Sequence, residues 1–173
     1  MKRAMDGAAV LVLLTGIVLA GSAQMAPPAQ APNPAFEKLK SLAGRWEGTY
    51  GEKKEPTAVS YSVVSNGTAV EETIHSADSS DMVTMYVRDG DRLVMTHYCS
   101  MGNQPRMVSK GLKNGNELEF VFQDITNLAD PKDGHMRGMV LKFVDNDHIT
   151  HSWTWREGGK DAKPEVFEVT RKK

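Results

Sequence analysis

Residues 148–156 read His-Ile-Thr-His-Ser-Trp-Thr-Trp-Arg, and this stretch decides the fold class. Ile149, His151, Trp153 and Trp155 stand at every second position, and the residues between them are polar. Successive side chains of a β-strand point to opposite faces of the sheet, so a period of two predicts a strand with one apolar face and one wetted face. Such strands are typical of antiparallel sheets.

The same alternation recurs on both sides of this stretch, for example in residues 91–100 and 116–124. Asn-Gly or Asp-Gly pairs mark breaks between the runs, at residues 66–67, 89–90 and 114–115. These pairs are the strongest local sign of a hairpin, because tight hairpin turns need residues that accept positive φ. The pattern predicts strands at 44–51, 57–65, 68–76, 81–89, 91–100, 105–112, 116–124, 135–145, 148–156 and 164–172.

Only residues 34–42 have helical spacing, with Phe36, Leu39 and Leu42 as the apolar positions. One short helix cannot cover ten antiparallel strands, whereas closing the sheet removes its exposed edges. We therefore expect an all-β fold, a ten-stranded antiparallel up-and-down barrel with one short N-terminal helix. A two-sheet sandwich is the alternative. A barrel of more than eight strands has room for a ligand inside.

The N-terminus has the pattern of an export signal. Lys2 and Arg3 precede an uncharged run over residues 8–20, and small residues follow at 21–23. We expect a signal peptide over 1–23, a Pro/Ala linker over 24–34, and a single domain over 35–173. The protein is then secreted or periplasmic, with no stable membrane anchor after cleavage; an uncleaved N-terminal anchor is the alternative.

Composition excludes several classes of function. The 173 residues carry a formal net charge of −1, which does not provide the basic surface that binding to nucleic acid needs. A single cysteine cannot form an intramolecular disulfide. The chain also lacks a Gly-rich phosphate loop, a Ser-centred nucleophile elbow and a Cys-x-x-Cys pair.

The inward-facing positions of the expected barrel supply the candidate site. His97 and Cys99 share a face with Met95, and His151 shares a face with two tryptophans. We expect them to line a cavity for a small hydrophobic or amphipathic molecule, with Arg106 at the rim to hold an anionic group. The expected ligand-binding residues are His97, Cys99, His151, Trp153, Trp155, Arg106, Met95 and Phe120, and the expected wall also includes Phe122, Met85 and Leu93.

No catalytic or metal-binding residue is assigned on this interpretation. One alternative is an enzyme that acts on a small molecule, with His97 as general base and Arg106 as anion clamp. Another is a structural or envelope-interaction module whose interior is filled by its own side chains.

Two stretches resemble known families. Residues 42–48, Leu-Ala-Gly-Arg-Trp-Glu-Gly, resemble the Gly-x-Trp opening of the lipocalin-like (calycin) barrels, and the Gly-x-Trp-x-Gly form is similar to the nitrobindin-like heme-binding barrels. Residues 96–107, Thr-His-Tyr-Cys-Ser-Met-Gly-Asn-Gln-Pro-Arg-Met, resemble a secreted bacterial lipocalin-like family of unknown function. The nitrobindin resemblance implies ten strands, a hydrophobic interior and a heme bound by a histidine late in the chain, here His151.

Overall fold

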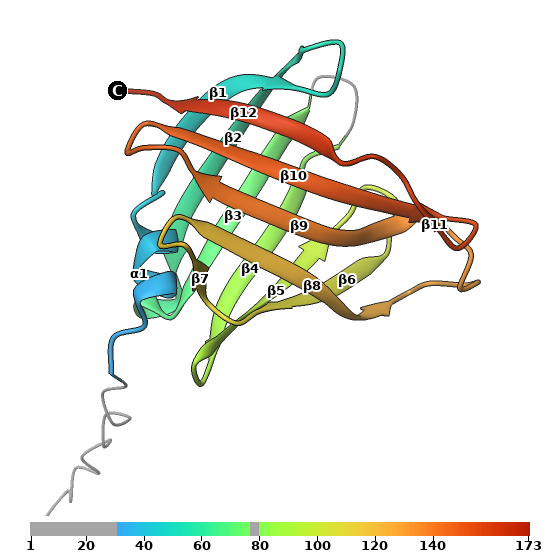
Figure 1. The fold of residues 1–173 in the computed structure, drawn as a ribbon, viewed down its shortest axis with the longest axis horizontal. Helices are drawn as coiled ribbons and strands as arrows, with labels where there is room; N and C mark the ends of the chain where they lie inside the picture. Colours follow the sequence, from blue (N-terminus) through green and yellow to red (C-terminus); the bar gives the residue numbers. More distant parts are fainter. Residues whose placement is uncertain (1–30, 77–79) are drawn as a thin grey trace, which may run out of the picture. The chain divides into compact units, whose positions relative to one another are not determined.

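The computed structural model describes residues 31–76 and 80–173, so the predicted signal peptide and linker residues 24–30 lie outside it (Figure 1). The described part contains a short helix, α1 (Pro34–Lys40), and a 12-stranded sheet. Its strands are β1 (Gly44–Tyr50), β2 (Glu55–Val64), β3 (Ala69–Ser76), β4 (Met82–Asp89), β5 (Arg92–Tyr98), β6 (Gln104–Ser109), β7 (Leu112–Lys113), β8 (Glu117–Thr126), β9 (His135–Phe143), β10 (His148–Glu157), β11 (Lys160–Asp161) and β12 (Glu165–Arg171).

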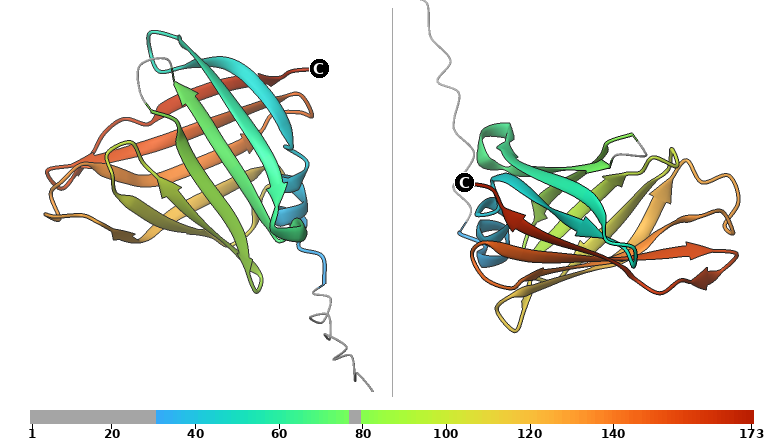
Figure 2. Two further views of the ribbon diagram at one scale, coloured as in Figure 1. Left: turned by 180° about the vertical axis from the view of Figure 1, so that it is seen from behind. Right: turned by 90° about the horizontal axis from the view of Figure 1, so that it is seen from above.

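The ten long strands form a closed antiparallel barrel, which confirms the predicted fold class. Each long strand pairs with the long strands before and after it in the sequence, and the pairing of β12 with β1 closes the barrel. Figure 2 shows the strands wrapping around a common interior from two further directions. The two-residue strands β7 and β11 are additions at the edges of β8 and β10, and the sandwich alternative is wrong.

Turns adopt the backbone conformations that the dipeptides predict. Asn66 and Gly67, between β2 and β3, have φ of 53° and 83°, and Asn114 and Gly115 have φ of 52° and 75°. Asparagine and glycine reach this region at lower cost than other residues. These two Asn-Gly pairs therefore mark where the β2–β3 and β7–β8 hairpins reverse.

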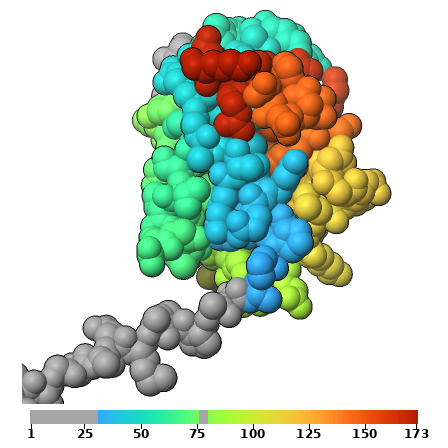
Figure 3. Space-filling view, turned by 90° about the vertical axis from the view of Figure 1, so that its left-hand side faces the viewer, coloured from blue at the N-terminus to red at the C-terminus, as the bar shows by residue number. Residues whose placement is uncertain are grey.

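The helix α1 closes one end of the barrel. The Asn33 side chain accepts a hydrogen bond from the backbone N–H of Phe36 at 3.1 Å, so Asn33, expected in the linker, is the N-cap of α1. Phe36 and Leu39 are buried in the core. Figure 3 looks onto this end, and the blue α1 covers the middle of the face. No helix in the described part of the chain is long and apolar enough to cross a membrane.

The Gly-x-Trp-x-Gly segment packs beside α1. Trp46 is fully buried, and its indole N–H donates to the backbone oxygen of Leu42 at 2.8 Å. The Arg171 guanidinium lies 4.2 Å from the centre of the Trp46 ring. At Gly48 a Cβ atom would be 1.9 Å from the backbone oxygen of Glu168 in β12, so no side chain fits there. These residues form the closed end of the barrel and leave the opposite end for a site.

Candidate functional site

A row of polar side chains crosses four neighbouring strands inside the barrel. Tyr61 of β2 pairs with Glu72 of β3, Glu72 with Thr84 of β4, and Thr84 with His97 of β5. None of the four is more than 3% exposed. Polar groups buried this deeply need hydrogen-bond partners, so their contacts show how the interior is organised.

His151 reaches this row from β10. Its Nε2 is 2.7 Å from the Tyr61 hydroxyl and 4.0 Å from Oε2 of Glu72. The Tyr86 hydroxyl donates to the same Glu72 oxygen at 2.9 Å. Burial, aided by the Glu72 charge, raises the pKa of both Tyr61 and Tyr86, so both phenols keep their protons. The four residues form a hydrogen-bonded layer across the barrel.

A cavity of about 170 Å³ lies at the end of the barrel opposite α1. Strand β1 begins next to α1, so Tyr50 at its other end, with Met82 at the start of β4 and Glu165 at the start of β12, marks the open end. The cavity is lined by Tyr50, Ile74, Met82, His97, Met136, Trp153, Glu165 and Phe167. The lining is mainly aromatic and aliphatic, as is usual for a small-molecule site.

His97 and Trp153 give this cavity its polar character. They are 1% and 2% exposed, and their ring centroids lie 4.6 Å apart. The Nδ1 atom of His97 is 2.9 Å from the Thr84 hydroxyl oxygen. Neither Nε2 of His97 nor Nε1 of Trp153 has a hydrogen-bond partner within residues 31–76 and 80–173. Burial lowers the pKa of His97 to about 4, so the imidazole is uncharged at neutral pH.

Acid is expected to destabilise the fold through the buried histidines. The pKa of histidine in an unfolded chain is about 6.5. Between about pH 6.5 and 4, His97 is therefore protonated in the unfolded chain but not in the folded protein. The free energy of unfolding consequently falls as the pH falls through this range. Burial also lowers the pKa of His151, which acts in the same direction. Urea unfolding at pH 7.5 and pH 5 measures the loss. His97→Gln should lose less stability than wild type over this pH range. Equal losses in the two proteins would contradict this assignment.

The expected site residues lie in several different parts of the barrel. Met95 and Phe120 are fully buried in the core and do not line the cavity, and His151 belongs to the hydrogen-bonded layer. Cys99 is buried just after β5, outside the cavity lining. Trp155 follows an irregularity in the β9–β10 pairing and packs against Gly134. Of the eight expected residues, the structure brings His97 and Trp153 together at the cavity.

Arg106 is not at the site. Its neighbours Pro105 and Met107 are buried, so the strand alternation turns Arg106 outward, where it forms two 2.5 Å hydrogen bonds to Asp124. The alternative of an enzyme with His97 as base and Arg106 as clamp therefore has the wrong geometry. Met85 of the expected wall lies between inward-facing Thr84 and Tyr86 and does not line the cavity.

Tyr61, Glu72 and Thr84 were not among the residues expected at the site. The signal was nevertheless present: Glu72 is in phase with Val70 and Ile74, and all three are buried. A charged residue at an inward position of an alternating strand is the mark of a buried polar contact.

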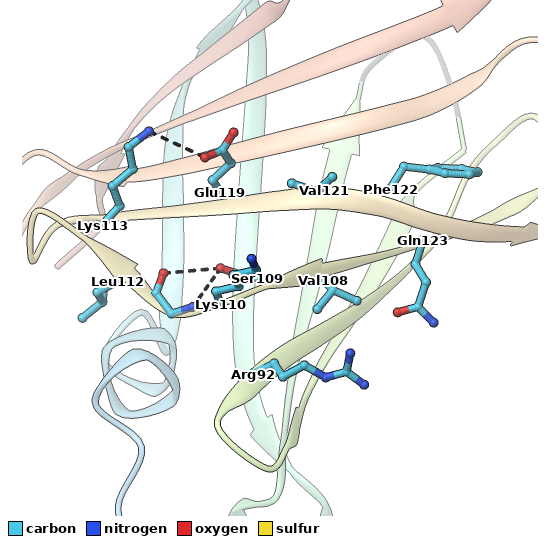
Figure 4. Close-up of a pocket in the computed structure, with 11 residues that line it drawn as sticks. Arg92, Val108, Ser109, Lys110, Leu112, Lys113, Glu119, Val121, Phe122 and Gln123 are labelled. Atoms are coloured by element: carbon cyan, nitrogen blue, oxygen red, sulfur yellow. Dashed lines mark hydrogen bonds and ion pairs between the residues drawn. The ribbon is translucent and has the colours of Figure 1, made fainter.

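A larger groove of about 720 Å³ lies on the outside of the barrel, over β6 and β8 (Figure 4). Val108 and the 58% exposed Val121 form its apolar floor, and Phe122 of the expected wall lies along it rather than in the cavity. Three of its four charged residues form ion pairs: Lys113 with Glu119 at 3.6 Å, and Arg92 with Asp89. None of the unpartnered buried polar atoms belongs to this groove. The inner cavity is therefore the stronger candidate.

The described interior does not fit a heme. His151, the iron ligand that the nitrobindin resemblance implies, does not line the cavity, and its Nε2 is occupied by Tyr61. A cavity of about 170 Å³ is close in size to one that holds a single benzene ring, so it cannot enclose a porphyrin. No group of three potential metal ligands occurs among the described residues.

Comparisons with known proteins support the fold alone. No protein-family model matches the chain, and no curated protein matches it in sequence. The crystal structure of Rv2717c from M. tuberculosis is similar, with a TM-score of 0.58 and 15% sequence identity, over 81% of this chain and 98% of that chain. At this identity the likeness is evidence for the barrel and says nothing about a ligand.

Proposed function

We propose that the protein binds a small, mostly apolar molecule in the cavity at the open end of the barrel. The observation that carries the proposal is the pair of buried, unpartnered nitrogen atoms of His97 and Trp153 in an otherwise apolar lining. More than nine in ten buried polar groups have a partner, and the exceptions need an explanation. A bound molecule that reaches these atoms supplies one.

The cavity volume limits the size of the ligand. An engineered apolar cavity of roughly 150 Å³ accepts benzene. A cavity of about 170 Å³ therefore suits a single-ring molecule or a short branched chain. Tyr50 and Phe167 stack at 5.0 Å beside the cavity and offer flat apolar surface to such a molecule.

The proposal extends to family and compartment. Membership in the lipocalin-like barrels is supported by the Gly-x-Trp opening and by the closed ten-stranded barrel. Export to the periplasm or medium is supported by the basic, apolar and small-residue pattern of residues 1–23. Fractionation of the native host, with detection of the chain and its N-terminal residue, tests the compartment.

Ethylbenzene binding, followed by titration calorimetry on the full chain, tests the proposed site. Met82→Trp places a larger side chain in the cavity lining and is expected to weaken binding at least tenfold, roughly 1.4 kcal/mol or more. Val121→Trp makes a matched change in the outer groove and is expected to leave the affinity unchanged. Loss of binding only in Val121→Trp, or no binding to wild type, would overturn the proposal. The second result would favour the structural-module alternative.

A further inference from the structure

The hydrogen bond between Thr84 and His97 determines which ring nitrogen carries the proton. Thr84 is fully buried, and His97 Nδ1 is the partner that the described residues give its hydroxyl. If Nδ1 were protonated, it would donate to Thr84, and the buried Thr84 O–H would have no acceptor. A buried hydroxyl proton without an acceptor costs about 1–3 kcal/mol. Thr84 therefore donates to Nδ1, and the proton of the neutral imidazole is on Nε2.

The cavity lining consequently contains two neighbouring rings that each carry an uncharged N–H donor. The indole nitrogen of Trp153 is always a donor, and Nε2 of His97 is a donor in this tautomer. Both atoms lack partners, and their rings lie 4.6 Å apart in one cavity lining. A carbonyl oxygen has two lone pairs, so one such oxygen can accept from both groups.

Resting on the proposed function, we propose that the ligand carries a neutral carbonyl group, as in a small ketone or aldehyde, whose oxygen accepts from Nε2–H of His97 and Nε1–H of Trp153.

The charges around the cavity favour a neutral acceptor over an anion. Of the described residues that line the cavity, only Glu165 carries a formal charge, and it is negative. A carboxylate ligand would be repelled by Glu165 and would meet no cationic group to offset its desolvation. An alcohol oxygen can also accept from both donors, but its own hydroxyl proton then needs a further acceptor. A ketone or aldehyde satisfies both donors and adds no proton of its own.

Three molecules of similar shape test this inference on the full chain. Ethylbenzene has no polar atom, acetophenone has a carbonyl acceptor, and 1-phenylethanol has a hydroxyl. Two neutral hydrogen bonds predict that acetophenone binds about tenfold more tightly than ethylbenzene, and more tightly than 1-phenylethanol. Equal affinities, or tightest binding of the alcohol, would overturn the carbonyl inference and leave the proposed function standing. Failure of all three to bind would overturn the proposed function itself.

Nuclear magnetic resonance supplies a readout that does not depend on affinity. The indole proton of Trp153 should move downfield with acetophenone and not with ethylbenzene, while that of Trp46, bonded to Leu42, should stay in place as the internal reference. Nitrogen-15 shifts of His97 should show the proton on Nε2 in the free protein. A proton on Nδ1, or an unmoved Trp153 signal with bound acetophenone, would overturn the inference.

Two variants separate the contributions of the donors. Trp153→Phe keeps an aromatic ring and removes the N–H, so the preference for acetophenone over ethylbenzene should fall about threefold. Thr84→Val removes the hydroxyl that directs the tautomer, so Nε2 protonation of His97 should decrease, and with it the preference for acetophenone. Thr84 is a positioning residue on this account. An unchanged preference in both folded variants would contradict it.

Discussion

Trp46→Ala is expected to lower the free energy of unfolding by about 3–5 kcal/mol, the usual cost of deleting a large buried aromatic side chain. The indole is fully buried, donates to Leu42 at 2.8 Å, and lies beneath the guanidinium of Arg171. Arg171 also donates to the backbone oxygens of Ala43 and Ser41 at 3.0 and 2.8 Å. The variant therefore loses apolar contacts at the point where β12, β1 and the segment after α1 meet.

Chemical unfolding followed by circular dichroism measures this loss. Trp155→Ala is the matched control, because Trp155 is partly exposed and packs against the loop residue Gly134. Its cost should be clearly smaller than that of Trp46→Ala. Equal costs, or a loss below about 1 kcal/mol for Trp46→Ala, would show that the closed end does not depend on the indole.

Gly48→Ala is expected to be nearly as damaging, at about 3 kcal/mol, although it adds a single carbon atom. The new Cβ would be 1.9 Å from the backbone oxygen of Glu168 and 2.9 Å from Cα of Val169. Backbone atoms cannot turn away as a flexible side chain can. The β1–β12 pairing, which closes the barrel, would have to separate locally.

Gly138→Ala is the matched control for this substitution. Gly138 also lies in a strand, β9, but a Cβ there meets only the backbone oxygen of Phe120 at an ordinary 3.6 Å. Its stability should change by less than about 1 kcal/mol. Similar melting temperatures for the two variants would contradict the close approach of β12 to Gly48.

The alternation of side chains was sufficient to predict the strands. All ten long strands appear within a few residues of their predicted bounds, because one face of each strand is buried and the other meets water. The same rule accounts for exposed His148 and buried His151, because positions three apart in a strand face opposite sides of the sheet. His135, the first residue of β9, is only 4% exposed, with its Nδ1 near the backbone oxygen of Asp133, although a residue at a strand end is usually open to water.

The candidate site was harder to predict, because it depends on register between distant strands. Tyr61 and His151 are hydrogen-bonded although 90 positions separate them, and no local pattern indicates that pair. Arg106 was expected at the rim of the cavity because it follows a loop. It faces outward instead, because its neighbours in β6, Pro105 and Met107, both point into the barrel. Trp155 does not line the cavity with Trp153, because the β9–β10 register shifts between Thr154 and Trp155.

The residues that stabilise the fold and those that line the cavity lie at different levels along the barrel axis. The end near α1 is filled by Trp46, Leu39 and their neighbours, and the layer of Tyr61, Glu72 and His151 forms the middle. The cavity occupies the remaining end. Substitutions at the closed end should therefore change unfolding far more than the affinity of the folded protein for a ligand.

Intermolecular nuclear Overhauser effects, measured with methyl-labelled full-length protein and ethylbenzene, show directly where the ring binds. We expect contacts from the ring protons to the methyl groups of Ile74, Met82 and Met136, which line the inner cavity. Contacts to Val108 and Val121 alone, the methyl groups of the outer groove, would contradict it.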